Sequence, residues 1–265
     1  MGDRNDFTRW LEDRGVRIID SPLPYLPFIE ALAAEKLYST VFAGHWLRTN
    51  ICLTEQDDEY VFYTDIDVLY RKDPDLAKIK PRYLAAAPEF DEKCWNYFNS
   101  GVMVQNVPSL REDYRYFERY LIANLCGRTY GFHDQIAYNE FYRERWDRLP
   151  TELNWKPYWG INENAQLLHF HGPKFGPMRE IVNERWDWTD KHRNQLASLF
   201  VKFCDSYLVA LEEVKPYLSE LNTSEQDELN DLFEKAHDYD WGRHARDINL
   251  TFTKQKMFGG KKRRT

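Results

Sequence analysis

Two carboxylates at the end of an apolar segment are the residues of this sequence best placed to do chemistry. Asp65 and Asp67 lie in the run YVFYTDIDVLY, residues 60 to 70. Residues two apart on a strand project toward the same side, and carboxylate oxygens suit Mn²⁺ or Mg²⁺, which can bridge phosphates. A polar strand end that caps a loop is the alternative. Two unpaired acids directly after a buried strand are costly without a cation, so the pattern favours a metal site.

A second polar cluster follows in the segment LLHFHGPKF, residues 167 to 175. His169 or His171 could complete the metal shell, and Lys174 could neutralise a diphosphate leaving group. Histidines that alternate on a strand are also common as structural or surface residues. Gly172 and Lys174 directly after them favour phosphate binding.

The order of four motifs resembles a known family. The two segments above, with FNSGVMVQN at 98 to 106 and HDQIAYN at 133 to 139 between them, occur in the order found in glycosyltransferase family 8 and its relatives. The similarity covers about residues 5 to 185. It implies an α/β fold of the GT-A (Rossmann-like) type, with a mixed sheet flanked by helices. It also implies a retaining, Mn²⁺-dependent transfer of a hexosyl or pentosyl group from a nucleotide-diphosphate sugar, a UDP-sugar, to a carbohydrate or other hydroxyl acceptor.

The resemblance assigns roles to individual residues. It places Asp65, Asp67 and His169 on the metal, with His171 as the second choice for the third ligand. It places Asp134 and Gln135 beside the anomeric carbon as catalytic residues, although Asp134 could instead be a helix N-cap. The donor is expected to contact Asp65, Asn99, Ser100, Gly101, Gly172 and Lys174.

The sequence departs from the family in two places. Lys174 follows Gly172 by two residues, where many members have three. The strand and helix with which the family usually begins, and which form its nucleobase pocket, have no counterpart here. We therefore expect the usual N-terminal strand to be absent and base recognition to be weak, unless the proline-rich loop at 21 to 28 or the C-terminal helices supply a pocket.

The elements that must position these residues follow from hydrophobic periodicity. We predict strands at 16–19, 60–70, 83–90, 101–107 and 165–172. We predict helices at 6–14, 44–49, 108–125 and 134–145. Beyond about Trp186, Phe200, Phe203, Tyr207 and Leu211 repeat at helical spacing. The prediction is a glycosyltransferase domain over residues 1–186 and a C-terminal helical appendage over 187–265.

Composition and charge argue against several classes of protein. The net charge of −7 argues against nucleic-acid binding through the body of the chain. No apolar stretch reaches the roughly 18 to 20 residues that span a bilayer, and the N-terminus is too polar for a signal peptide. The 4 cysteines form no CxxC pair, which fits a reducing compartment, and we predict a cytoplasmic protein. The basic tail, Lys254 to Arg264, is either solvated or a contact for an anionic membrane or a partner protein.

Three functions remain open at this point. The first is the glycosyltransferase, and the second is a metal-dependent phosphotransferase or nucleotidyltransferase, which leaves the FNSG and HDQ segments without a role. The third is a degenerate, non-catalytic module of a larger protein. The aromatic loop NWKPYWG, residues 154 to 160, could line an acceptor site or could pack under the helical appendage.

Overall fold

The computed structural model describes residues 4–40, 43–128, 131–190 and 193–244. The basic tail lies outside the described residues. The chain forms two compact units that alternate along the sequence. The first comprises residues 1–63, 77–86 and 98–149, and the second comprises residues 64–76, 87–97 and 150–265.

A four-stranded sheet organises the first unit, in the order β1–β4–β3–β5. The strands are β1 (Tyr60–Thr64), β3 (Leu84–Pro88), β4 (Phe98–Asn106) and β5 (Asp147–Arg148). β3 and β5 run parallel, with Ala85 opposite Asp147. Every residue of β4 is buried, because this strand has a neighbour on each side. Tyr63 and Ala86 are the last residues of β1 and β3 in this unit, so both strands lead directly into the second unit.

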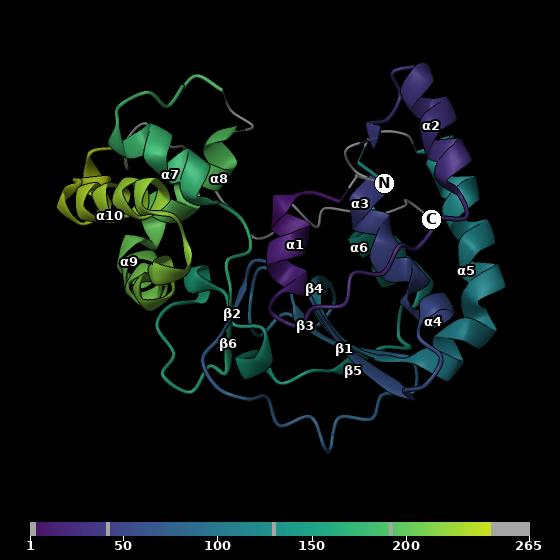
Figure 1. Cartoon of the computed structure of the whole chain (residues 1–265). Helices are drawn as coiled ribbons and strands as arrows, with labels where there is room; N and C mark the ends of the chain where they lie inside the picture. Colours follow the sequence, from purple (N-terminus) through teal and green to yellow (C-terminus); the bar gives the residue numbers. More distant parts are fainter. Residues whose placement is uncertain (1–3, 41–42, 129–130, 191–192, 245–265) are drawn as a thin grey trace. The chain divides into compact units, whose positions relative to one another are not determined.

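The helices of this unit lie above and beside this sheet in the view of Figure 1. They are α1 (Asp6–Glu12), α2 (Leu26–Ala34), α3 (Ala43–Trp46), η2 (Leu47–Asn50), α4 (Ile51–Thr54), α5 (Val107–Gly127) and α6 (Asp134–Phe141). The long helix α5 packs against α2 and α4. It begins where the Asn106 side chain accepts a hydrogen bond of 3.1 Å from the backbone of Ser109, with a proline in its first turn. Both features favour a helix start.

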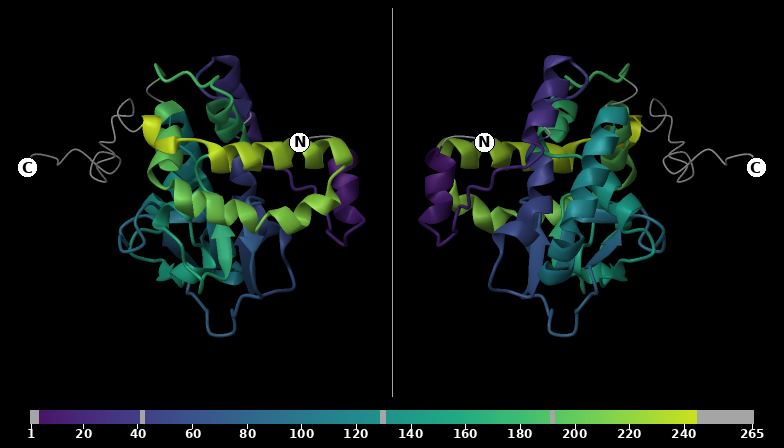
Figure 2. Two further views of the ribbon diagram at one scale, coloured as in Figure 1. Left: turned by 90° about the vertical axis from the view of Figure 1, so that its left-hand side faces the viewer. Right: turned by 90° about the vertical axis from the view of Figure 1, so that its right-hand side faces the viewer.

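The second unit contains a strand pair and a group of helices. Its elements are β2 (Val68–Tyr70), η3 (Thr151–Leu153), η4 (Pro157–Trp159), β6 (Leu167–His169), α7 (Phe175–Val182), α8 (Arg193–Lys202), α9 (Cys204–Glu212), η5 (Lys215–Glu220), α10 (Thr223–Asp238) and η6 (Trp241–His244). The yellow-green α10 packs against α7 and α9 (Figures 1 and 2). This unit has its own core, in which Phe200 and Phe233 are fully or almost fully buried.

The predicted α/β class, with a sheet flanked by helices, is confirmed, and helices do follow residue 186. The strand predicted at 16–19 is wrong: these residues are irregular, and Val16 and Ile19 are 44% and 53% exposed. The proposed single strand at 60–70 is interrupted, because residues 65–67 separate β1 from β2. The domain boundary near residue 186 remains a prediction.

Among the described helices, none is both long and apolar enough to cross a membrane.

Candidate metal and donor site

Pairing between β2 and β6 brings the two acidic residues to the histidine. The strands are antiparallel, with Val68 opposite His169, and the backbone amide of Phe170 donates a 2.9 Å hydrogen bond to the carbonyl of Asp67. As a result, Asp65, Asp67 and His169 each offer a ligand atom, all within 4.8 Å of one another. Two hard oxygen ligands and one imidazole suit Mn²⁺. All three residues belong to the second unit.

The hydrogen bonding of His169 leaves one ring nitrogen available for a metal. Nδ1 lies 2.8 Å from Oδ1 of Asn154, and an amide oxygen only accepts, so Nδ1 carries the proton. Nε2 is then unprotonated and has no hydrogen-bond partner, although it lies 3.4 Å from Oδ1 of Asp67. Burial lowers the pKa of His169 to about 3. A buried lone pair facing a carboxylate fits a cation, and an outer hydrogen bond to the other nitrogen is usual for metal-binding histidines.

Lys174 occupies the open side of Asp67. Its ammonium donates to Oδ2 of Asp67 and, at 2.6 Å, to the carbonyl of Phe170. The pKa of Asp67 lies below its usual range: burial raises it, and the contact with the Lys174 ammonium lowers it. Lys174 is also the N-cap of α7 and makes no side-chain cap, so its charge lies at a helix N-terminus, where anions are favoured.

His171 takes a different position from the one that would make it a ligand. Its Nε2 lies 3.1 Å from Oε1 of Glu89, and its Nδ1 lies 3.0 Å from the hydroxyl of Tyr158. Both ring nitrogens are therefore engaged away from Asp67. Gly172, next in sequence, has a φ of +98°, and a Cβ there would lie 3.2 Å from Cδ1 of Leu199. Both facts give this half of the motif a structural role in the second unit.

A buried lysine, Lys156, lies close to Glu89, the residue that contacts His171. The ammonium of Lys156 donates a 2.6 Å hydrogen bond to the carbonyl of Pro88 and lies 4.0 Å from the ring centre of Trp159. Burial lowers the pKa of Lys156 to about 7, and Glu89 offsets only part of this effect. The folded protein therefore releases this proton at a lower pH than the unfolded chain does.

We expect Lys156 to make the free energy of unfolding rise with pH. Between about pH 7 and the ordinary lysine pKa of 10.5 the unfolded chain binds the proton and the folded protein does not, so stability increases across that window. Urea unfolding at pH 7, 8 and 9.5 should show this rise in the wild type and in Lys93→Met, whose side chain is 88% exposed. Lys156→Met should have a higher free energy of unfolding than the wild type at pH 7. Its free energy of unfolding should also rise less between pH 7 and pH 9.5. Equal pH slopes in all three proteins would contradict the assignment.

In the first unit, Asp134 forms a buried ion pair that the sequence did not indicate. Its Oδ2 lies 3.2 Å from Nε of Arg48, and the two side chains are 5% and 10% exposed. Burial would raise the pKa of Asp134, but the nearby His133 imidazole and the charge of Arg48 lower it. The N-cap of α6 is His133, so Asp134 is not a cap. Arg48 lies on η2, far in the sequence from any of the motifs. The only sequence signal for it is that a buried Asp134 needs a cationic partner.

The other predicted sugar-contacting residues gather around Gln135. Its Oε1 accepts hydrogen bonds from the backbone of Ser100 at 2.9 Å and from the amide of Asn99 at 3.2 Å. The Asn99 oxygen in turn accepts from the backbone of Gly101 at 3.0 Å, and the Ser100 hydroxyl donates to Asp134 at 3.1 Å. The β4 and α6 motifs thus form one polar group, which we call the Asp134 group: Arg48, Asn99, Ser100, Gly101, Asp134 and Gln135.

The proline-rich segment borders a cavity of about 650 Å³ in the first unit. Ser21, Leu23 and Leu26 line it together with Arg48 and Tyr63. The guanidinium of Arg48 lies 5.0 Å from the centre of the Tyr63 ring. This cavity therefore adjoins the arginine of the Asp134 group.

The aromatic loop at 154 to 160 is tied to its own unit. The indole of Trp155 donates to the carbonyl of Gly160 at 2.7 Å, and that of Trp159 donates to the carbonyl of Phe90 at 3.1 Å. Tyr158 is only 4% exposed. The rings of this loop are therefore packed within the second unit.

Comparison with known proteins gives matches among solved structures only. No family model and no curated protein matches the sequence. The galactosyltransferase LgtC, in complex with donor and acceptor sugar analogs, is 17% identical, with a TM-score of 0.40, over 51% of this chain and 59% of that one. The glycosyltransferase GlyE of Streptococcus pneumoniae TIGR4 is 18% identical, with a TM-score of 0.41, over 54% and 43%. The bifunctional glycosyltransferase WbbM is 18% identical, with a TM-score of 0.40, over 50% and 32%. This chain covers less than two thirds of the length of each.

Proposed function

We propose that this chain is a metal-dependent glycosyltransferase of the GT-A type. It would move a sugar from a nucleotide-diphosphate sugar, a UDP-sugar, to a hydroxyl acceptor with retention at the anomeric carbon. The observation that supports this most is His169, whose unprotonated Nε2 is buried and faces Asp67. Asp65 completes a group with the oxygen and nitrogen ligands that Mn²⁺ accepts.

Asp65, Asp67 and His169 would hold the ion, which when bound supplies Lewis-acid stabilisation of a diphosphate leaving group. Lys174 neutralises Asp67 in the protein as described. Its side chain is 51% exposed, so it is free to turn from Asp67 to a phosphate oxygen. The uncapped N-terminus of α7 beside it adds backbone N–H groups for the same anion.

The Asp134 group is suited to hold the donor sugar. Sugar hydroxyls are hydrogen-bond donors and acceptors, and the ionised Asp134 and the amide of Gln135 offer complementary atoms in a fixed geometry. Arg48 and Ser100 hold the Asp134 carboxylate in place, which preorganises the group before a ligand binds. The neighbouring cavity is our candidate for the nucleobase.

Two other functions use part of the same residues. A phosphotransferase would need the metal and Lys174 but would give the Asp134 group no substrate. A non-catalytic module would retain Mn²⁺ binding without turnover. Hydrolysis of a panel of UDP- and GDP-sugars, with and without Mn²⁺, separates these functions, because only the transferase releases free sugar and nucleoside diphosphate.

The metal assignment is tested by comparing the two histidines. We expect His169→Ala to weaken Mn²⁺ binding at least about tenfold in calorimetry, since it removes a ligand. His171→Ala should change Mn²⁺ affinity by less than about threefold, because both its nitrogens face Glu89 and Tyr158. It should instead lower the free energy of unfolding by about 1 to 3 kcal/mol, since it removes the imidazole that contacts the buried Glu89.

The outcome of this comparison is decisive in either direction. If His171→Ala loses more Mn²⁺ affinity than His169→Ala, the ligand set is wrong by two residues. If neither variant changes Mn²⁺ affinity, this group is not the metal site, and the proposed function loses its main support.

A further inference from the structure

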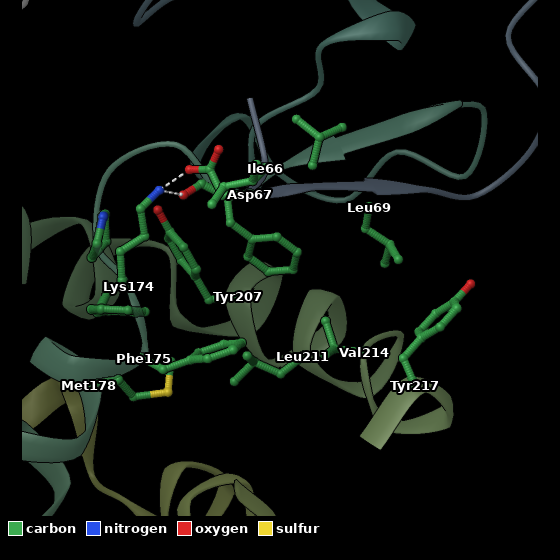
Figure 3. A pocket seen from close by; sticks show the side chains of 14 residues that line it. Ile66, Asp67, Leu69, Lys174, Phe175, Met178, Tyr207, Leu211, Val214 and Tyr217 are labelled. Carbon is green, nitrogen blue, oxygen red and sulfur yellow. Dashed lines mark hydrogen bonds and ion pairs between the residues drawn. The ribbon is translucent and has the colours of Figure 1, made fainter. Parts of the chain in front are cut away.

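An apolar cavity of about 360 Å³ lies next to Asp67 and Lys174 within the second unit (Figure 3). Its walls come from the β2 segment, from the segment that leads into α7 and the first turn of that helix, and from α8, α9 and η5. The apolar side chains that line it include Leu69, Phe170, Phe175, Met178, Leu211 and Val214. In Figure 3 the Lys174–Asp67 pair closes one end and Tyr217 stands at the other. The volume lies in the range of small-molecule pockets, which are mostly apolar with a few polar groups.

The mouth of this cavity is also apolar. Ile66, the residue between the two acids, lines the cavity and is 96% exposed. Tyr217 at the other end is 54% exposed. Large exposed apolar side chains at the rim of a pocket mark sites that a ligand covers. A ligand that extends from the cavity past Ile66 would therefore bury apolar surface within reach of the metal-binding acids.

One polar group inside the cavity has no partner. Tyr207 lines it and is 2% exposed, and its hydroxyl makes no hydrogen bond to any described residue. In Figure 3 its hydroxyl points toward the end where Lys174 and Asp67 lie. Buried hydroxyls nearly always have a partner. The orphan hydroxyl thus indicates a ligand whose oxygen comes between the apolar walls and the acidic end.

We propose that this cavity binds the apolar tail of the acceptor, an alkyl or aryl aglycone, with the polar head of the acceptor between Tyr207 and Asp67. Its role as acceptor site rests on the proposed function. In the transfer, an acceptor hydroxyl oxygen would bond to C1 of the donor sugar as the bond from C1 to the diphosphate breaks. The nucleoside diphosphate would leave with the electron pair, and the hydroxyl proton would pass to solvent. At roughly 30 Å³ for each heavy atom, the cavity of about 360 Å³ holds about a dozen atoms, which corresponds to an eight-carbon chain together with the nearest atoms of the polar head.

The test uses butyl, hexyl, octyl and decyl β-D-glucosides below their micellar concentrations, titrated into the full chain without Mn²⁺ or nucleotide. We expect saturable binding to one site, with affinity rising about fourfold for each added CH₂ as apolar surface is buried. The rise should stop near eight carbons, when the cavity is full. If the affinity does not depend on the length of the alkyl chain, the proposal is wrong. The wild-type protein alone is enough for this test.

Two valine substitutions localise the effect. Val214 lines the cavity, whereas Val209 on α9 is 39% exposed and does not line it. Val214→Trp should fill the cavity and weaken octyl glucoside binding at least tenfold. Val209→Trp should bind like the wild type, and circular dichroism checks that both variants fold. Equal affinities in two folded variants would place the alkyl chain elsewhere.

The outcomes separate this proposal from the proposed function. If alkyl glucosides bind as expected while no nucleotide sugar is turned over, the apolar site stands and its role as an acceptor site is refuted. If nucleotide sugars are turned over in a Mn²⁺-dependent reaction but affinity ignores chain length, the glycosyltransferase stands and the acceptor is held elsewhere.

Discussion

Asp67→Asn is expected to lower Mn²⁺-dependent turnover of a nucleotide-diphosphate sugar by about a thousandfold, since metal stabilisation of a leaving group contributes several kcal/mol. The amide keeps the size of the carboxylate but removes its charge. In the wild type the pKa of Asp67 lies below its usual range, because the Lys174 ammonium acts against the effect of burial, so the residue is ionised at neutral pH. Initial rates at saturating Mn²⁺ measure the loss.

The same substitution has a smaller effect on stability. Because the pKa of Asp67 is lower in the folded protein than in the unfolded chain, its contribution is present above the ordinary carboxyl pKa and is lost as pH falls through the folded value. The Lys174 side chain is 51% exposed, so solvent screens its contact with Asp67. We therefore expect Asp67→Asn to lower the free energy of unfolding by only about 1 kcal/mol. Asp73→Asn, at an exposed position of the same unit, is the control. Full turnover in Asp67→Asn would remove Asp67 from the metal site.

Asp134→Ala should abolish turnover and also lower the free energy of unfolding by about 3 kcal/mol, because it removes the carboxylate that pairs with the buried Arg48 charge. The more exposed pair of Asp113 and Arg145 provides a control in the same unit, with side chains 21% and 38% exposed. Asp113→Ala should cost less than about 1 kcal/mol and leave turnover unchanged. Urea unfolding and donor hydrolysis measure the two effects.

A double variant separates the structural effect from the catalytic one. Arg48→Met with Asp134→Leu replaces the buried ion pair by apolar side chains, which is often neutral for stability. We expect this protein to recover most of the lost stability while turnover stays abolished. If the double variant regains turnover, Asp134 acts only by holding the fold together.

Local sequence patterns predicted the elements that carry chemistry. The apolar run before Asp65, the buried strand predicted at 101–107 and the helix that begins at Asp134 all appear near the predicted positions, although the strand begins three residues earlier, at Phe98. Each is defined by side-chain periodicity and by turn or cap residues within a few positions, so no distant contact is needed to recognise it. The residue types were also informative, because carboxylates, imidazole and lysine suit a metal and a phosphate wherever the chain places them.

The features that local patterns did not predict depend on contacts between segments that are distant in the sequence. The segment at 16–19 has the β-branched residues of a strand but pairs with none of the described strands, and propensity alone does not form one. The two histidines look alike in sequence, yet only His169 lies opposite Val68 and turns a free nitrogen toward Asp67. Arg48 became recognisable only when the fold placed it beside Asp134. Strand register and the pairing of buried charges depend on which segments meet in space, and sequence spacing does not encode this.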